Sequence, residues 1–242
     1  MAASKAKQGR KSAVKAKKND ELGVNDKLNE FVQKNRKGLV LGLIAIVVIL
    51  IGFGVGFSLK EKIATESFSK LDAFGQRYDD LKAYIGSEEP DAVAKQTDIG
   101  ALLDDLAAFE KKTTGFAAAK AYSISADIYA GEKKWAEAGD AWSASAKAAA
   151  KTYLAPVSVF NAAVAAEEQG NTQSAIDLYT QALNYGDSFP DAARAQFAIG
   201  RLQESNSNKD AAIEAYKNLV AKWPYDPLWA NLAQSRMMVL SE

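Results

Sequence analysis

The chain repeats one pentamer three times, as Ala138-Gly-Asp-Ala-Trp142, Ala175-Ile-Asp-Leu-Tyr179 and Ala212-Ile-Glu-Ala-Tyr216, with both intervals equal to 37 residues. A small residue precedes the first alanine of each pentamer by twelve positions and keeps the same interval. A fixed period of this length indicates stacked units of supersecondary structure, each of which buries its apolar face against the next unit. The coincident registers therefore predict three helical hairpins.

The order of small residue, alanine and aromatic residue resembles the tetratricopeptide repeat, although the usual period of that family is about 34 residues. The resemblance implies close contact of two helices at the small residues, with the aromatic residue filling the space between hairpins. Hairpins are expected at 116–149, 154–186 and 190–222, with Gly131 and Gly170 at interhelix turns. The residues assigned to this structural signature are Ala126, Ala138, Trp142, Ala163, Ala175, Tyr179, Gly200, Ala212 and Tyr216.

The rest of the chain also has helical periodicity, without an alternating strand pattern. One long helix is predicted at 60–86, its partner at 97–111, and a closing helix at 227–240 that caps the array. The predicted fold class is all-α: an α-solenoid of tetratricopeptide-like hairpins behind one N-terminal transmembrane helix. Five parts are expected along the chain. The first three are a basic tail with a short amphipathic helix (1–37), the transmembrane helix (38–59) and the long helix with an irregular first hairpin (60–115). Three repeats (116–226) and the capping helix (227–242) follow.

Residues 38–59 form a run of 22 residues without a charge. As a helix this run would extend about 33 Å, enough to cross a hydrocarbon core of about 30 Å. A cleaved signal peptide is the alternative, but its apolar region is usually only about 7–15 residues long and is followed by a small-residue cleavage site that this chain lacks. Whether the motifs Gly38-x3-Gly42 and Gly52-x3-Gly56 pair such helices stays open.

Residues 1–37 carry eleven lysines and arginines against four acids, a net charge of +7 that the remainder of the chain balances. An excess of basic residues before the span predicts that the N-terminus is in the cytoplasm and that the C-terminal domain lies on the other side of the membrane. Residues 1–20 are expected to be disordered. Their lysines suit anionic lipid better than nucleic acid, because no aromatic residue lies among them to stack on bases. Residues 25–36 predict a short amphipathic helix with Leu28 and Phe31 on one face.

Histidine and cysteine are both absent from the chain. Their absence excludes Ser-His-Asp and Cys-His nucleophiles, as well as metal sites built on imidazole or thiolate. Carboxylate pairs such as Glu167-Glu168 are expected on solvated helix faces. We therefore predict a protein that is not an enzyme and that has no cofactor or metal.

Repeat arrays bind segments of other proteins on the concave surface made by the first helix of each hairpin. Phe160 and Phe197 lie one period apart on this surface. They are either apolar anchors of a groove or core residues between hairpins, and burial of both would favour a structural spacer over a binding scaffold. The residues predicted to line the groove are Lys120, Ser123, Asp127, Val157, Phe160, Val164, Arg194, Phe197 and Arg201.

The order of parts is similar to that of the YfgM-like ancillary subunits of the bacterial Sec translocon. Phe31, Asn35 and Lys37 match the F-x-x-x-N-x-K pattern of that family before its membrane helix, and Asp105-Leu-Ala-Ala-Phe109 also fits. The resemblance covers most of 25–222. It implies a location in the bacterial inner membrane, with the C-terminal domain in the periplasm, and contacts with the translocon and with periplasmic chaperones. The alternative is a spacer or assembly subunit of an envelope or flagellar complex.

Overall fold

The computed structural model describes residues 23–87 and 90–242, and these form helices and turns without a β-strand. The tail predicted to be disordered, residues 1–20, lies outside the described residues. The chain divides into two compact units, Met1–Ala64 and Thr65–Glu242. The second of these is called the repeat unit below.

Residues 23–34 are helical, and after a turn at Asn35 the helix α2 (Arg36–Leu81) begins. The side-chain amide of Asn35 donates a hydrogen bond of 2.9 Å to the carbonyl oxygen of Phe31, which supports this turn. Leu28 and Phe31 are both exposed. α2 contains the charge-free run, with a mean hydropathy of 2.9 in its most apolar window and no burial there. By length and composition it is able to cross a membrane, although a signal sequence would meet the same criteria.

The long helix ends earlier than predicted, at Leu81 instead of residue 86. Gly86 has a left-handed φ of 71°, which no helix continues through, and it lies against the backbone of Gly131. The partner helix α3 (Pro90–Glu110) begins seven residues before the predicted start at 97. Proline suits the first position of a helix because the N–H group it lacks would have no partner there.

An apolar cluster joins α2 and α3 to the first regular hairpin within the repeat unit. Ile99, Leu102 and Leu106 of α3 are fully buried in this cluster, which also includes Leu71 of α2. The rings of Phe74 and Phe109 meet edge to face with 5.5 Å between their centroids. The irregular first hairpin is therefore packed onto the array by apolar contacts.

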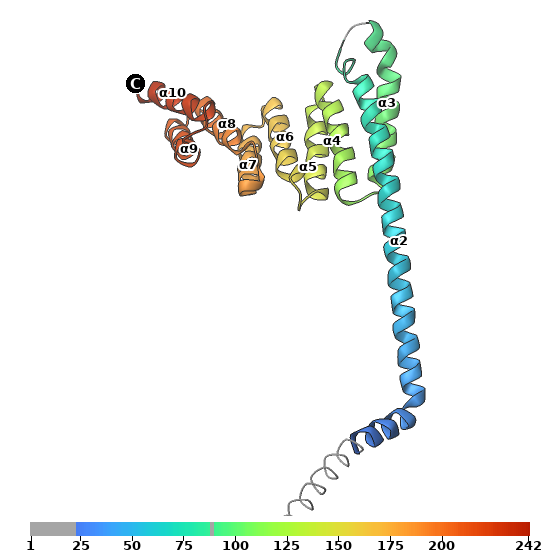
Figure 1. The fold of residues 1–242 in the computed structure, drawn as a ribbon. Coiled ribbons are helices and arrows are strands. Elements are labelled where there is room, and N and C mark those ends of the chain that lie inside the picture. Colours follow the sequence, from blue (N-terminus) through green and yellow to red (C-terminus); the bar gives the residue numbers. More distant parts are fainter. Residues whose placement is uncertain (1–22, 88–89) are drawn as a thin grey trace, which may run out of the picture. The chain divides into compact units, whose positions relative to one another are not determined.

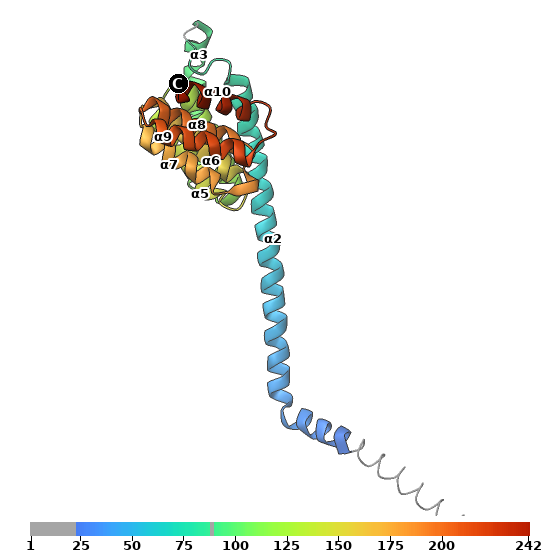
Figure 2. The same cartoon turned by 90° about the vertical axis from the view of Figure 1, so that its left-hand side faces the viewer.

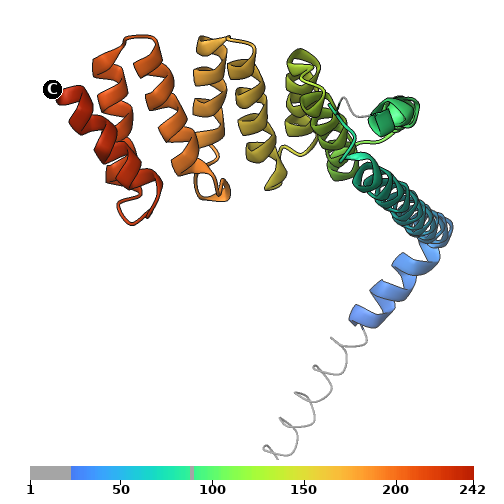
Figure 3. The ribbon, with the colours of Figure 1, turned by 90° about the horizontal axis from the view of Figure 1, so that it is seen from above.

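Three regular hairpins follow, with a single helix after them. They stack side by side in chain order, as Figures 1 and 3 show, whereas Figure 2 looks along the stack. The helices are α4 (Gly115–Gly131), α5 (Trp135–Ala148), α6 (Leu154–Glu168), α7 (Thr172–Leu183), α8 (Ala192–Ser205), α9 (Lys209–Lys222) and α10 (Trp229–Ser241), with a short 3₁₀ helix at Gly186–Ser188.

All nine residues of the repeat signature are buried. The alanines at the close contacts, including Ala138, Ala175 and Ala212, have no exposed surface. Gly200 shows why this position must be small: a Cβ atom there would lie 2.7 Å from Cδ1 of Tyr216. The 37-residue period thus places small residues where neighbouring helices touch.

The turn between the two helices of each hairpin has one left-handed residue, and this residue also recurs every 37 positions. It is Lys133 (φ 58°), Gly170 (φ 75°) and Ser207 (φ 59°) in the three hairpins. Gly131, expected at the turn, instead ends α4, and a Cβ atom there would lie 2.6 Å from Cγ2 of Ile85. Only one of the two predicted turn glycines has the left-handed conformation, because the other is needed for close packing.

Candidate protein-binding groove

A cavity of about 260 Å³ opens between α6, α8 and α10. Five of the nine residues predicted to line a groove meet here: Phe160, Val164, Arg194, Phe197 and Arg201. The other residues around the cavity are Glu167, Glu168, Tyr179, Ala198 and Trp229. First helices from successive hairpins therefore converge on one site with aromatic, cationic and anionic groups.

The two phenylalanines one period apart have different environments. Phe160 is only 4% exposed, and its ring packs against Tyr179 and Phe189 with centroid distances of 5.3 and 5.8 Å. Phe197 is half-buried and lies against Tyr216 and Trp229. Phe160 therefore belongs to the core and forms the floor of the cavity, while Phe197 retains a partly exposed surface.

The two arginines also differ. Arg201 forms an ion pair of 2.5 Å with Oε1 of Glu167 on the preceding hairpin. The guanidinium of Arg194 is exposed and lies 4.9 Å from the centroid of the Phe160 ring, a cation–π distance. Within the described residues Arg194 forms no ion pair, so its charge is available to a ligand.

Glu167 accepts two interactions that bind three helices together. The Tyr179 hydroxyl of α7 donates a hydrogen bond of 3.2 Å to Oε2 of Glu167, and Arg201 of α8 contacts Oε1. Burial, followed by the charge of Glu167, raises the pKa of Tyr179. We call this arrangement of glutamate, tyrosine and arginine a clamp.

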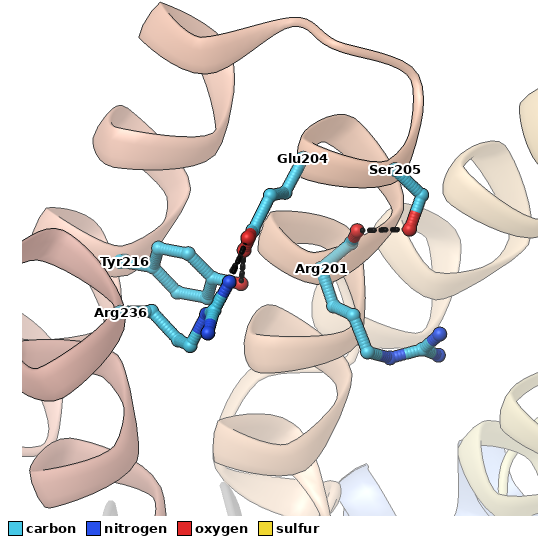
Figure 4. A network of polar contacts seen from close by, with 5 residues as sticks. All are labelled: Arg201, Glu204, Ser205, Tyr216 and Arg236. Atoms are coloured by element: carbon cyan, nitrogen blue, oxygen red, sulfur yellow. Dashed lines mark hydrogen bonds and ion pairs between the residues drawn. The ribbon is translucent and has the colours of Figure 1, made fainter. Parts of the chain in front are cut away.

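A second clamp lies one hairpin further along, where Glu204, Tyr216 and Arg236 meet (Figure 4). The Tyr216 hydroxyl donates to Oε2 of Glu204 at 3.1 Å, and Nε of Arg236 donates to the same oxygen at 3.2 Å. The hydrogen bond from Arg236 lowers the pKa of Glu204, and burial raises that of Tyr216 to about 12. The arginine comes from α10, so the clamp fastens this last helix to the array.

A second cavity, of about 450 Å³, adjoins this clamp and shares Phe197 and Arg201 with the first cavity. Its remaining lining residues are Glu204, Ser205, Tyr216 and Arg236. Phe197, Glu204 and Tyr216 here take the places that Phe160, Glu167 and Tyr179 have in the first cavity, 37 positions earlier. The two cavities together form the groove discussed below.

The clamps were not predicted from the sequence, although one signal for them was present. Glu167 and Glu204 keep the 37-residue interval, but Glu167 was expected on a solvated face. It is half-buried, whereas its neighbour Glu168 is exposed. Arg201 and Arg236 are 35 residues apart, so a search with the repeat period does not find them together.

The predicted groove residues of the first hairpin do not line either cavity. Ser123 is half-buried and belongs to a chain of hydrogen bonds: its hydroxyl lies 3.0 Å from that of Ser145, which lies 2.9 Å from that of Ser158. The Ser145 hydroxyl also donates to the carbonyl oxygen of Ala119 at 2.8 Å. We call this chain the serine ladder. Ser123 therefore joins helices instead of facing a ligand.

Asp127 and Lys120 lie on α4, near Trp142 of α5. Burial raises the pKa of the Asp127 carboxyl to about 6, while a hydrogen bond from Trp142 and the charge of Lys120 partly oppose this rise. Val157 is half-buried on α6 and lies outside both lining sets. The structure thus gathers the candidate site at the second and third hairpins.

Comparison with known proteins supports the repeat fold of this region. Residues 160–227 match the family model described as tetratricopeptide repeat. A "TPR repeat-containing protein" of Treponema pallidum (strain Nichols) is 38% identical over 127 residues, which are 52% of this chain and 52% of that protein. The chain therefore spans about half the length of this curated relative. Tetratricopeptide repeats are scaffolds for protein–protein interaction, and proteins that contain them are typically not enzymes.

Proposed function

We propose that this protein is a membrane-anchored tetratricopeptide-repeat scaffold that binds segments of other proteins in the periplasm. The observation that carries the proposal is the cavity between α6, α8 and α10. It combines a partly exposed aromatic side chain, Phe197, with an exposed cation, Arg194, that has no ion-pair partner among the described residues. An apolar side chain of a partner would enter the cavity while a neighbouring carboxylate pairs with Arg194.

The location of this scaffold is part of the proposal. Its support is the charge-free run within α2 and the excess of basic residues before that run, which together favour a membrane anchor with a cytoplasmic N-terminus. The similarity at Phe31, Asn35 and Lys37 supports the bacterial inner membrane and an ancillary, chaperone-like role in protein translocation or envelope assembly. The partners would then be the Sec translocon, periplasmic chaperones and their clients, with membrane lipid around the anchor and no nucleic acid.

A structural spacer in an envelope or flagellar assembly is the second candidate. The burial of Phe160 favours it, because one of the two expected apolar anchors is held in the core. Phe197 is only half-buried, so the groove keeps the other anchor.

Photo-crosslinking in intact cells separates the two candidates. A photoreactive residue replaces Glu168, an exposed residue that lines the cavity, and the control carries it at Lys217, which is exposed on α9. A scaffold gives discrete crosslinked partners from position 168 that are absent from position 217. A spacer gives no partners specific to position 168, and that result would reject the scaffold.

A charge reversal tests the chemistry of the site. Arg194→Glu should weaken capture of the crosslinked partner, by about tenfold or more for loss of a charge-assisted hydrogen bond. The helical signal should remain, because Arg194 is exposed. Lys217→Glu is the matched control and should bind as the parent does.

Protease treatment of spheroplasts tests the topology. Protease added outside should digest residues 60–242 and leave the basic tail intact, because the positive charges precede the span. Protection of the repeat unit in intact spheroplasts would contradict the proposed orientation.

A further inference from the structure

Two connections between helices carry exposed lysines in the first half of the repeat unit. Lys111 and Lys112 lie between α3 and α4, Lys147 is in the last turn of α5, and Lys151 lies between α5 and α6. All four side chains are exposed, and none of them forms an ion pair within the described residues. We call these four residues the lysine edge.

The two connections lie side by side. The ring of Phe116, at the start of α4, has its centroid 6.1 Å from that of Tyr153 in the α5–α6 connection. Phe116 also packs against the buried cluster of Ala119, Ala149 and Leu154, which joins α4, α5 and α6. Figure 1 shows both connections at the same edge of the array. The four lysines therefore belong to one surface.

The repeat unit as a whole is acidic, and the lysine edge is an exception. Residues 65–242 contain 17 lysines and arginines against 25 aspartates and glutamates, a net charge of −8. The segments 111–126 and 141–166, which include both connections, contain five lysines and no acidic residue. Glu110, the nearest acid along α3, is half-buried and accepts a hydrogen bond of 2.8 Å from the Ser125 hydroxyl. An anionic surface is therefore repelled by most of the unit and attracted at this edge.

The connections further along the array lack this basic character. The connection between α7 and α8 carries Asp187 and Asp191 without a lysine. At the connection between α9 and α10, Lys222 is accompanied by Asp226. Unopposed lysines are thus restricted to the two connections nearest α2.

The chain enters the repeat unit beside the lysine edge. Phe74 of α2 packs edge to face on Phe109, with 5.5 Å between the ring centroids, and Phe109 precedes Lys111 by two residues. Phe74 is fifteen positions beyond Leu59, the last residue of the charge-free run, and a helix of that length extends about 22 Å. If the charge-free run spans a membrane, this short link keeps the lysine edge within reach of the lipid headgroups.

We propose that the lysine edge docks on anionic phospholipid headgroups of the membrane that holds the anchor. The proposal rests on that anchor, which is part of the proposed function, and adds a second contact with the same membrane. Lysines close to an anionic bilayer are attracted to its headgroups. None of the residues that line the groove belongs to this edge, so docking and partner binding are compatible.

Two observations favour lipid over a soluble polyanion such as nucleic acid or an acidic protein. The first is the position of the lysines, which lie only at the connections closest to the anchor. The second is Tyr153, which lies among them and is 59% exposed. Tyrosine is enriched where membrane and water meet, because its ring is apolar and its hydroxyl is polar.

Quenching by labelled lipid measures docking, since the parent chain has no cysteine and a single thiol can be labelled. Thr114→Cys carries a fluorophore on the exposed α3–α4 connection, and Ser174→Cys carries it at an exposed position of α7 as the control. The full chain is reconstituted in vesicles of phosphatidylcholine, alone or mixed with phosphatidylglycerol, with a quencher on the headgroups. Quenching at position 114 should be several times greater with the anionic lipid and should fall as salt rises. Position 174 should not distinguish the two lipid mixtures.

Charge reversal tests whether the lysines are responsible. In the chain labelled at position 114, Lys147→Glu together with Lys151→Glu should lower the ratio of docked to undocked protein more than tenfold, since each lysine near an anionic surface contributes about fivefold. Lys209→Glu together with Lys217→Glu makes the same charge change at exposed positions of α9 and should leave this ratio nearly unchanged. Circular dichroism of both variants reports whether the helices remain folded.

Flotation of the full chain with phosphatidylcholine vesicles tests the anchor separately. A chain that does not float would overturn the anchor and, with it, this proposal. A chain that floats but is quenched equally at position 114 in both lipid mixtures would overturn docking alone, because the link itself would then explain the proximity. An unchanged ratio in the variant with both Lys147→Glu and Lys151→Glu would also overturn it. A change of emission with DNA or polyglutamate, but not with anionic vesicles, would assign the edge to a soluble polyanion.

Discussion

The contact between the first two regular hairpins and the contacts between later hairpins share the same packing of small residues. The polar side chains that connect the helices differ between these two kinds of junction. Between α4, α5 and α6 the connection is the serine ladder, which includes Ser145 and Ser158, exposed by 0% and 1% respectively. Between the later hairpins it is the clamp, whose Arg201 and Glu167 side chains are 45% and 23% exposed. Neutral hydroxyls thus join helices where water is excluded, and ions join them where water still reaches.

The physical reason is the cost of removing charge from water. Each ion of a pair buried as deeply as Ser145 would lose roughly several kcal/mol of solvation free energy. The attraction within the pair would recover this loss only with excellent geometry. Serine hydroxyls are satisfied there by each other and by one backbone carbonyl. Repeats of equal length can therefore differ in what stabilises them. Three substitutions, in order of decreasing effect, and then a comparison of pH dependence test that difference.

The largest effect should come from disrupting the packing that all the junctions share. Ala175→Asp introduces a carboxylate at a helix contact without exposed surface, and should lower the free energy of unfolding by several kcal/mol, on the order of 3–5. Ser174→Asp, on the exposed neighbouring position, should change it by about 0.5 kcal/mol or less. Thermal unfolding followed by circular dichroism measures both. Equal melting of Ala175→Asp and the parent would mean that the assigned repeat register is wrong.

Removing the centre of the serine ladder should have the next largest effect. Ser145→Ala takes away the donor to the Ala119 carbonyl and the partner of the Ser158 hydroxyl, both in a buried region, and should cost about 1–3 kcal/mol. Ser143→Ala on the same helix is the control, since Ser143 is only half-buried. Urea titration compares the two variants. A loss no larger than that of the control would show that the ladder contributes little.

Breaking the first clamp should cost less. Arg201→Gln removes an exposed ion pair, which is usually worth about 1 kcal/mol or less. Added salt screens exposed charges, so the difference from the parent should shrink as salt rises. The loss in Ser145→Ala should be nearly independent of salt. A salt-independent loss in Arg201→Gln would indicate that the clamp acts through packing and not through charge.

The last comparison concerns pH, to which the two regions respond with opposite signs. The pKa of Asp127 is raised to about 6, so the folded state binds its proton more tightly than the unfolded state and stability falls as pH rises from about 4 to 6. The pKa of Glu204 is lowered by Arg236, so its stabilisation is present above about pH 4.5 and is lost as pH falls. Asp127→Asn should remove the first dependence and Glu204→Gln the second. Unfolding curves across pH 3–7 test this assignment, and an unchanged pH profile in either variant would contradict it.

The 37-residue period predicted the hairpins, their small contact residues and the arrangement of α4 to α10 closely. These features could be predicted because each repeat makes the same contacts with its neighbour, so that one interval describes them all. The boundaries near 82–90 were less accurate, since α2 ends at Leu81, turns run from there to the left-handed Gly86, and Pro90 begins the next helix. Local backbone chemistry, and not periodicity, decides these ends.

By itself the sequence determined the helical class, the repeat register and the presence of one helix apolar enough to cross a membrane. Only the tertiary structure decided that Phe160 is core while Phe197 borders a cavity, since the two occupy the same register position but have different neighbours. It also decided that Arg236 of α10 completes a clamp with Glu204. Each depends on which side chains from separate hairpins converge when the repeats stack, and a spacing along the chain does not contain that information.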